Sequence, residues 1–130
     1  PAAGRILERV TPPGFEYSVQ SVCAKDSQEI TPADRELVFR ACEDTSCDRI
    51  IVTHGTDTLI DTAAYIGQKH EGSKLARKRI CVTGSMRPER FVDTDAHFNL
   101  GVCFGALSTV EPGVYVCMNG QVHEWNAVTR

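Results

Sequence analysis

A group of residues that can donate and accept protons lies where a predicted strand becomes a predicted helix. Residues 54–58 read HGTDT, after the apolar run 49–53 and before a helical pattern of apolar residues. The Thr56 hydroxyl could act as a nucleophile, the Asp57 carboxylate could take a proton or hold a cation, and the free N–H groups at a helix start favour an oxyanion. Together these groups suit the hydrolysis of a small amide.

Simpler interpretations of the same residues stay open. Asp57 or Thr56 could merely cap the helix, as these residue types often do. His54 could be a base near neutral pH, or a structural hydrogen-bonding residue at the end of a strand. Gly55 permits a tight turn of the backbone.

Strands and helices alternate along the chain. This order predicts right-handed βαβ crossovers and an α/β fold, with a mainly parallel sheet covered by helices on both faces in a doubly wound, flavodoxin-like arrangement. The Asn119-Gly120 pair predicts a C-terminal β-hairpin. Strands are expected over residues 15–22, 49–53, 79–84, 113–118 and 121–125.

Three predicted helices each carry an apolar stripe. The first has a helix-start signature, with Thr31 as N-cap, Pro32 at the first helical position and Asp34 at the third. The stripes consist of Leu37, Val38, Ala41 and Cys42 on the first helix, Leu59, Thr62, Ala63 and Ile66 on the second, and Leu100, Cys103, Phe104 and Leu107 on the third.

Polar residues follow three of these strands, at Asp26-Ser27, at residues 53–58 and at residues 83–85. Parallel strands bring their carboxyl ends to one edge of the sheet, where ligands bind in open α/β folds. Asp26 and Ser27 could hold a ligand's ammonium and carboxylate groups there, or simply form an Asx-turn.

The composition excludes some partners and suggests a compartment. The chain has 130 residues, 42% of them hydrophobic, and a net charge of −3, so neither nucleic acid nor an anionic membrane is an expected partner. Its six cysteines form no C-x-x-C pair. We expect them to be mostly buried, reduced thiols in a cytoplasmic protein, with disulfides or a bound metal as the alternatives.

The sequence VTHGTDTLIDTAAYI resembles the second active-site signature of the bacterial-type L-asparaginase family. Four further segments resemble family motifs in the same order: KDSQEITPADR, ICVTGSMRP, DAHFNL and GVYVCMNGQV. The resemblance extends from about residue 17 to residue 129. It identifies residues 1–130 as a single domain of the asparaginase N-terminal type.

The resemblance implies roles for individual residues. Thr56 and Asp57 match the catalytic threonine and its acidic partner, and the aspartate also receives the substrate's ammonium group. Ser27, with Asp26, matches the loop that holds the substrate's carboxylate. Two further substrate-binding positions are implied: Gly55 matches a backbone donor close to the substrate, and Ser85 matches a residue whose backbone carbonyl faces the side-chain amide.

The implied reaction converts L-asparagine and water to L-aspartate and ammonia through a threonine nucleophile, without a metal or cofactor. The implied partners are a small amino-acid substrate and further copies of the chain, in a homodimer or higher homo-oligomer. A non-catalytic amino-acid-binding or interaction domain of the same fold is the main alternative. An amidase module of a transfer-RNA amidotransferase is disfavoured because the chain shows no basic stripe.

Two departures from the family pattern bear on activity. The family's first signature, a Thr-Gly-Gly-Thr strand end, is expected before Pro1 and is absent from these 130 residues. Arg130 stands where the catalytic lysine is expected. Because arginine stays protonated, it cannot serve as a base. We therefore expect residues 1–130 alone to lack the first strand of the domain and to show negligible hydrolysis.

Overall fold

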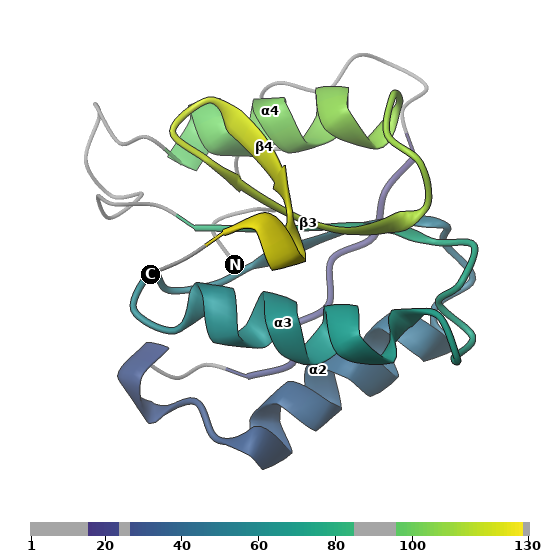
Figure 1. Cartoon of the computed structure of the whole chain (residues 1–130), viewed down its shortest axis with the longest axis vertical. Coiled ribbons are helices and arrows are strands. Elements are labelled where there is room, and N and C mark those ends of the chain that lie inside the picture. The colour runs from purple at the N-terminus through teal and green to yellow at the C-terminus, as the bar shows by residue number, and fades with distance from the viewer. Residues whose placement is uncertain (1–15, 24–26, 85–95, 129–130) are drawn as a thin grey trace.

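The computed structural model describes residues 16–23, 27–84 and 96–128 (Figure 1). In these ranges no helix is long and apolar enough to cross a bilayer. The elements are, in chain order, η1 (Ser27–Glu29), α2 (Pro32–Asp44), β1 (Arg49–Thr53), α3 (Leu59–His70), β2 (Arg79–Thr83), α4 (Ala96–Leu107), β3 (Gly113–Met118), β4 (Gln121–Glu124) and η2 (Trp125–Ala127).

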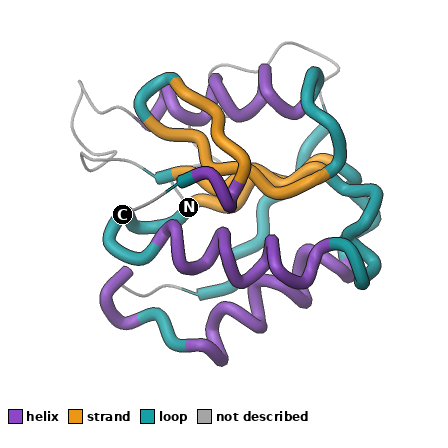
Figure 2. The backbone as a smooth tube through the Cα atoms, in the orientation of Figure 1, coloured by secondary structure: helices purple, strands orange, loops and turns teal. Residues whose placement is uncertain are grey.

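The four strands form one mixed sheet in the order β1-β2-β3-β4 (Figure 2). β1 and β2 are parallel with Arg49 opposite Arg79, β2 and β3 are parallel with Arg79 opposite Gly113, and β3 and β4 are antiparallel. The hairpin turn is formed by Asn119 and Gly120 at φ angles of 55° and 75°, the left-handed values that a type I′ turn requires. The mainly parallel α/β fold and its C-terminal hairpin are confirmed.

Helices cover both faces of the sheet, α2 and α3 on one side and α4 on the other (Figure 1). Successive side chains of β2 point to opposite faces of the sheet, so that Ile80 and Val82 face α3 while Cys81 faces α4. The larger core consists of Phe39, Cys42, Leu59, Ala63, Ile66, Leu75, Ile80, Val82, Val114 and Val116. The smaller core, under α4, consists of Cys81, Cys103, Ala106, Leu107, Tyr115 and Cys117.

The prediction that every βαβ crossover is right-handed is wrong. Both crossovers, β1-α3-β2 and β2-α4-β3, step to the next strand in the same direction across the sheet. Two such steps of the same hand would place α3 and α4 on the same face, yet their cores lie on opposite faces. The two crossovers therefore have opposite hands, and one is the uncommon left-handed form.

Helix α2 begins as predicted, and Val38 and Cys42 of the predicted stripe pack into the larger core, but Phe39 is buried in place of Leu37. Thr31 and Asp34 form a reciprocal capping box, with Pro32 at the start of the helix. The side chain of Leu37, expected on the apolar stripe, is 54% exposed, whereas Phe39 is buried. Phe39 and Cys42 are three positions apart and lie on one face of the helix, and this face packs into the larger core.

The strand expected over residues 15–22 is not formed in the described part of that segment. Residues 16–23 have no regular secondary structure, and Tyr17 and Val19 are 39% and 43% exposed. Alternating apolar residues make a strand only when a neighbouring strand bonds to the backbone and a core covers the apolar face. No described strand pairs with this segment.

None of the six cysteines is in a disulfide, and four are buried. Burial raises the pKa of the Cys42 thiol to about 11, although Lys78 opposes this rise. Hydrogen bonds with Cys103 and Cys81 lower the pKa of the Cys117 thiol. Hydrogen bonds with Cys103 and Cys117 raise the pKa of the Cys81 thiol. The prediction of mostly buried, unpaired thiols is confirmed.

The buried Lys78 side chain satisfies the last carbonyl groups of α2. Its Nζ donates to the carbonyl oxygens of Cys42 at 2.7 Å and Thr45 at 2.6 Å. These carbonyls lie at the C-terminal end of the helix, where a cation is favourable and other partners are scarce. The segment before β2 thus holds the end of α2 in place.

We expect Lys78→Met to lower the free energy of unfolding by about 2–3 kcal/mol, because buried carbonyls lose a charged donor while the stem volume is kept. The matched control is Lys74→Met, which changes an exposed lysine and should stay within about 0.5 kcal/mol. Urea unfolding followed by circular dichroism measures both. Equal effects of the two substitutions would contradict the structural role of Lys78.

Candidate active site

The turn between β1 and α3 carries the residues singled out by their chemistry. The N-cap of α3 is Thr58, and its side chain makes no capping hydrogen bond. The interpretation that Thr56 or Asp57 merely caps the helix is therefore wrong. Both residues precede the cap, at the carboxyl end of β1, where Asp57 is exposed and Thr56 is partly buried.

Ser27 is joined to Thr58 by a closed set of hydrogen bonds. The backbone N–H of Thr58 donates to Ser27 Oγ at 2.6 Å. The Thr58 hydroxyl donates to the Ser27 carbonyl at 2.7 Å. The two hydroxyl oxygens lie 2.9 Å apart, and since the Thr58 proton is already used, Ser27 is the donor in this contact.

This arrangement bears on the role that the resemblance implies for Ser27. Its side chain is buried, and its hydroxyl proton points to Thr58, so no proton remains for a substrate carboxylate unless the side chain rotates. Its role in substrate binding stays a prediction. What the structure shows is that Ser27 fastens η1 to the start of α3.

Gln28 adds a second contact between the two segments. Its Nε2 donates to Asp57 Oδ2 at 2.9 Å, which orients a carboxylate that is otherwise exposed. The sequence patterns assigned no role to Gln28 or Thr58. In the sequence these two residues are notable only as neighbours of Ser27 and Asp57. Adjacency in the sequence does not reveal that Gln28 contacts Asp57, which is 29 residues away.

Two glycines allow the backbone segments at this edge to lie close together. A Cβ atom at Gly55 would lie 2.6 Å from Ser27 Cβ. A Cβ atom at Gly84 would collide with the His54 carbonyl oxygen and touch the Thr56 methyl group at 3.4 Å. The ends of β1 and β2 and the η1 segment therefore meet at one place, as expected for the carboxyl edge of a parallel sheet.

His54 is held in a hydrogen-bond network that uses both ring nitrogens. Nδ1 lies 2.6 Å from the Gly55 carbonyl, and Nε2 lies 2.8 Å from the Thr62 hydroxyl. Arg35 Nε donates to the same hydroxyl at 3.2 Å. With a neutral ring, Nδ1–H donates to Gly55 and Nε2 accepts from Thr62, so His54 is a structural residue in this arrangement and offers no nitrogen to Thr56.

The structure leaves part of the predicted site untested. Ser27, Gly55, Thr56 and Asp57 lie together, whereas Asp26, Ser85 and Arg130 fall outside the described residues. Two shallow hollows on the described surface lie elsewhere, one between α2 and α3 and one beside Trp125.

Gly55→Ala should lower the free energy of unfolding by about 1–3 kcal/mol, because the added methyl group would push Ser27 away from the turn. Gly72→Ala is the matched control, since a Cβ there meets nothing within 4 Å, and it should cost at most about 0.5 kcal/mol. Chemical denaturation of the two variants measures the difference. If Gly55→Ala is as stable as Gly72→Ala, the close packing of Ser27 on Gly55 is wrong.

The stability of the protein should fall with acidification. Burial lowers the pKa of His54 below its ordinary 6.5; the Gly55 carbonyl opposes this shift and the Arg35 charge adds to it. Below the ordinary pKa the unfolded chain therefore binds more protons than the folded protein, and the free energy of unfolding decreases as pH drops.

The check is urea unfolding of the wild type, His54→Gln and His123→Gln between about pH 5 and pH 7.5. His54→Gln should flatten the decline, whereas His123→Gln, on the exposed strand β4, should leave it unchanged. A decline of the same steepness in His54→Gln would assign the effect to other groups.

Comparison with known proteins shows the family to which the chain belongs. The family profile described as "Asparaginase, N-terminal" matches residues 3–130. "L-asparaginase 2" of Escherichia coli is 32% identical over 92 residues, which cover 66% of this chain and 25% of that protein. The chain thus spans about a quarter of the length of that relative.

Solved structures show the same fold. The thermostable L-asparaginase from Thermococcus kodakarensis superposes with a TM-score of 0.76 at 26% identity, over 93% of this chain and 37% of that one. A Campylobacter jejuni structure described as "Probable Cytoplasmic L-asparaginase" has a TM-score of 0.81 at 20% identity, over 95% of this chain and 40% of that one. By its sequence match along residues 3–130, this chain belongs to the asparaginase family, in the part described as its N-terminal domain.

Proposed function

We propose that the protein is an asparaginase-like amidohydrolase that converts L-asparagine and water to L-aspartate and ammonia. The observation that carries the proposal is the meeting of η1 with the turn after β1, through the Ser27–Thr58 and Gln28–Asp57 hydrogen bonds. This meeting places the residues that match the family's catalytic and substrate-loop motifs side by side. The relatives named above are L-asparaginases by their descriptions.

In this proposal Asp57 receives the substrate's ammonium group. Its carboxylate is exposed at the sheet edge. Gln28 donates a hydrogen bond to one of the two carboxylate oxygens, Oδ2. A positively charged amine is attracted to such an oriented carboxylate more strongly than to one that rotates freely. The substrate is therefore an amide that also carries an α-amino group.

Thr56 acts beside Asp57 in the hydrolysis, with its hydroxyl directed to the reacting amide. The step needs a base that accepts the hydroxyl proton. His54 does not supply it in the observed arrangement, because both its nitrogens are bonded, and arginine at position 130 cannot accept a proton. In this proposal the base is a residue other than these two.

The bonded ring of His54 and the arginine at position 130 favour a second candidate function, binding of an amino acid without hydrolysis. Asp57 and the η1 segment could still hold the charged groups of a ligand. Such a domain would bind L-aspartate as well as L-asparagine, because neither ligand needs to react.

The deciding experiment measures ammonia release from L-asparagine and from L-glutamine, and binding of L-aspartate by calorimetry. The proteins are the wild type, Asp57→Asn, Thr56→Ala and Thr56→Ser, each made as the full natural chain because residues 1–130 by themselves are expected to show negligible hydrolysis. Asp57→Asn and Thr56→Ala should each lower kcat/KM by about 10³-fold or more, with partial activity in Thr56→Ser. Asp48→Asn is the matched control, because Asp48 is exposed at the opposite end of β1.

Two results would contradict hydrolysis. Binding of L-aspartate that Asp57→Asn abolishes, with no ammonia release from either amide, would establish the binding domain. Turnover that Asp57→Asn and Thr56→Ala leave unchanged would place the reaction elsewhere. Circular dichroism of each variant separates these results from misfolding.

The proposal extends to the setting of the protein. We place it in the cytoplasm, in line with its unpaired thiols and the description of the Campylobacter jejuni structure. We also propose a homodimer or higher homo-oligomer, which sedimentation at several protein concentrations would test.

A further inference from the structure

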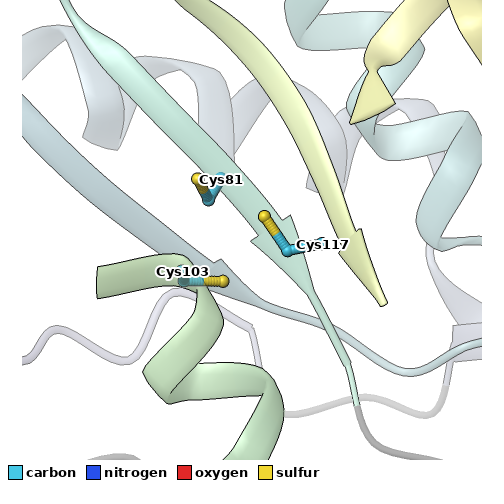
Figure 3. Close-up of side chains that lie close together, drawn as sticks. All are labelled: Cys81, Cys103 and Cys117. Atoms are coloured by element: carbon cyan, nitrogen blue, oxygen red, sulfur yellow. The ribbon is translucent and has the colours of Figure 1, made fainter. Parts of the chain in front are cut away.

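Three cysteine sulfurs meet in the smaller core, between the sheet and α4 (Figure 3). Cys81 comes from β2, Cys117 from β3 and Cys103 from α4. The three sulfur atoms all lie within 4.8 Å of one another, and each residue is 0% exposed. We call these three residues the thiol cluster.

The register of the sheet and the position of α4 explain the meeting. Cys117 lies opposite Thr83 in the β2–β3 pair, so Cys81 and Cys117 are diagonal neighbours that point to the same face. Helix α4 covers that face and places Cys103 over the two strands, as Figure 3 shows. The cluster thus depends on three separate elements, each fixed by its own packing.

Thiols are concentrated in this layer. Three of the six buried residues in the smaller core are cysteines, compared with one of ten in the larger core on the other face. Aliphatic side chains fill the larger core at equivalent strand positions, for example Ile80 and Val82. If cysteine served only as a small apolar residue, we would expect it equally often in both cores. Among the described residues, however, three cysteines meet only in the core under α4.

Among the described contacts the surroundings offer no carboxylate or imidazole ligand, and the oxygen beside the cluster is the Thr83 hydroxyl, which is hydrogen-bonded to Cys103. The Thr83 hydroxyl donates to the Cys117 carbonyl at 2.6 Å, and the Tyr115 hydroxyl donates to the Glu111 carbonyl at 2.6 Å. Within the described residues, the cysteines are the only group of histidine, cysteine or carboxylate ligands close enough to share an ion. The donor set therefore consists of three sulfurs.

We propose that Cys81, Cys103 and Cys117 form a site for a soft metal ion, bound as Cu(I) by three thiolates. Soft sulfur ligands select ions such as Cu(I), and calcium, magnesium and manganese prefer oxygen. Zinc usually takes four ligands, and this buried site supplies three. Each thiol that binds the ion releases its proton to the solvent.

The geometry requires only a small adjustment. Three sulfurs around an ion at about 2.3 Å from each lie roughly 4 Å apart. The observed limit of 4.8 Å therefore calls for a contraction of less than about 1 Å, within the range of side-chain rotation. None of the ligands is a candidate active-site residue, so the site is separate from the proposed hydrolysis.

The test loads Cu(I) anaerobically onto two complementary variants and challenges each with excess glutathione. The first keeps the thiol cluster and carries Cys23→Ser, Cys42→Ala and Cys47→Ser. The second keeps those three cysteines and carries Cys81→Ala, Cys103→Ala and Cys117→Ala. We expect the first to retain one Cu(I) with three sulfur ligands by X-ray absorption, and the second to lose its copper to glutathione.

A single substitution guards against failure of the triple variant to fold. Cys103→Ala should weaken Cu(I) binding by at least about 100-fold, the upper range seen when outer partners of a metal site are removed, while circular dichroism stays unchanged. Cys42→Ala, a buried cysteine outside the cluster, should leave the affinity as it is.

Three results would overturn the proposal. The first is copper retention that is the same in both complementary variants. The second is loss of all copper to glutathione from the cluster-only variant. The third is tighter binding of Zn²⁺ than of Cu(I), with four ligands.

Discussion

The hydrogen bonds between Ser27 and Thr58 are the contact on which the candidate site depends. They fasten a short 3₁₀ turn to the first residues of α3, more than thirty positions later in the chain. The glycine at position 55 makes the contact possible by leaving room for the Ser27 side chain. Asp57 then accepts a hydrogen bond from Gln28. The η1 segment and the turn after β1 therefore both contribute residues to the carboxyl end of β1. Without this join, the residues after β1 would form an ordinary exposed turn with no fixed neighbour.

Local patterns in the sequence predicted much of the fold because local physics decides those features. The capping box of α2, the strand β1 and the Asn119-Gly120 turn each depend on residues close together in the chain. Contacts between distant segments could not be predicted in the same way. The exposure of Leu37, the absence of a strand near Tyr17 and the Gln28–Asp57 bond are set by which element packs where. The site residues were selected by chemical type and motif, and only their four described members could be located.

The opposite hands of the two crossovers divide the protein into chemically different layers. With α3 on one face and α4 on the other, the strands of the sheet serve two cores at once. One core is aliphatic and joins α2 and α3 to the sheet. The other is small and rich in sulfur. Had both crossovers had the same hand, α3 and α4 would lie on the same face of the sheet. Because they lie on opposite faces, α4 has a core of its own, and this core holds the only group of three described thiols that meet.

The buried ammonium group of Lys78 has a consequence for how local opening can be observed. Its nitrogen is enclosed by the carbonyl oxygens at the end of α2, so an amine-directed acylating reagent reaches it only when that helix end separates from the sheet. Exposed lysines such as Lys74 react without any opening. The labelling rate of Lys78 relative to Lys74 therefore reports the free energy of this partial unfolding, which can be far smaller than that of the whole domain. A single natural lysine serves as an internal probe of helix docking.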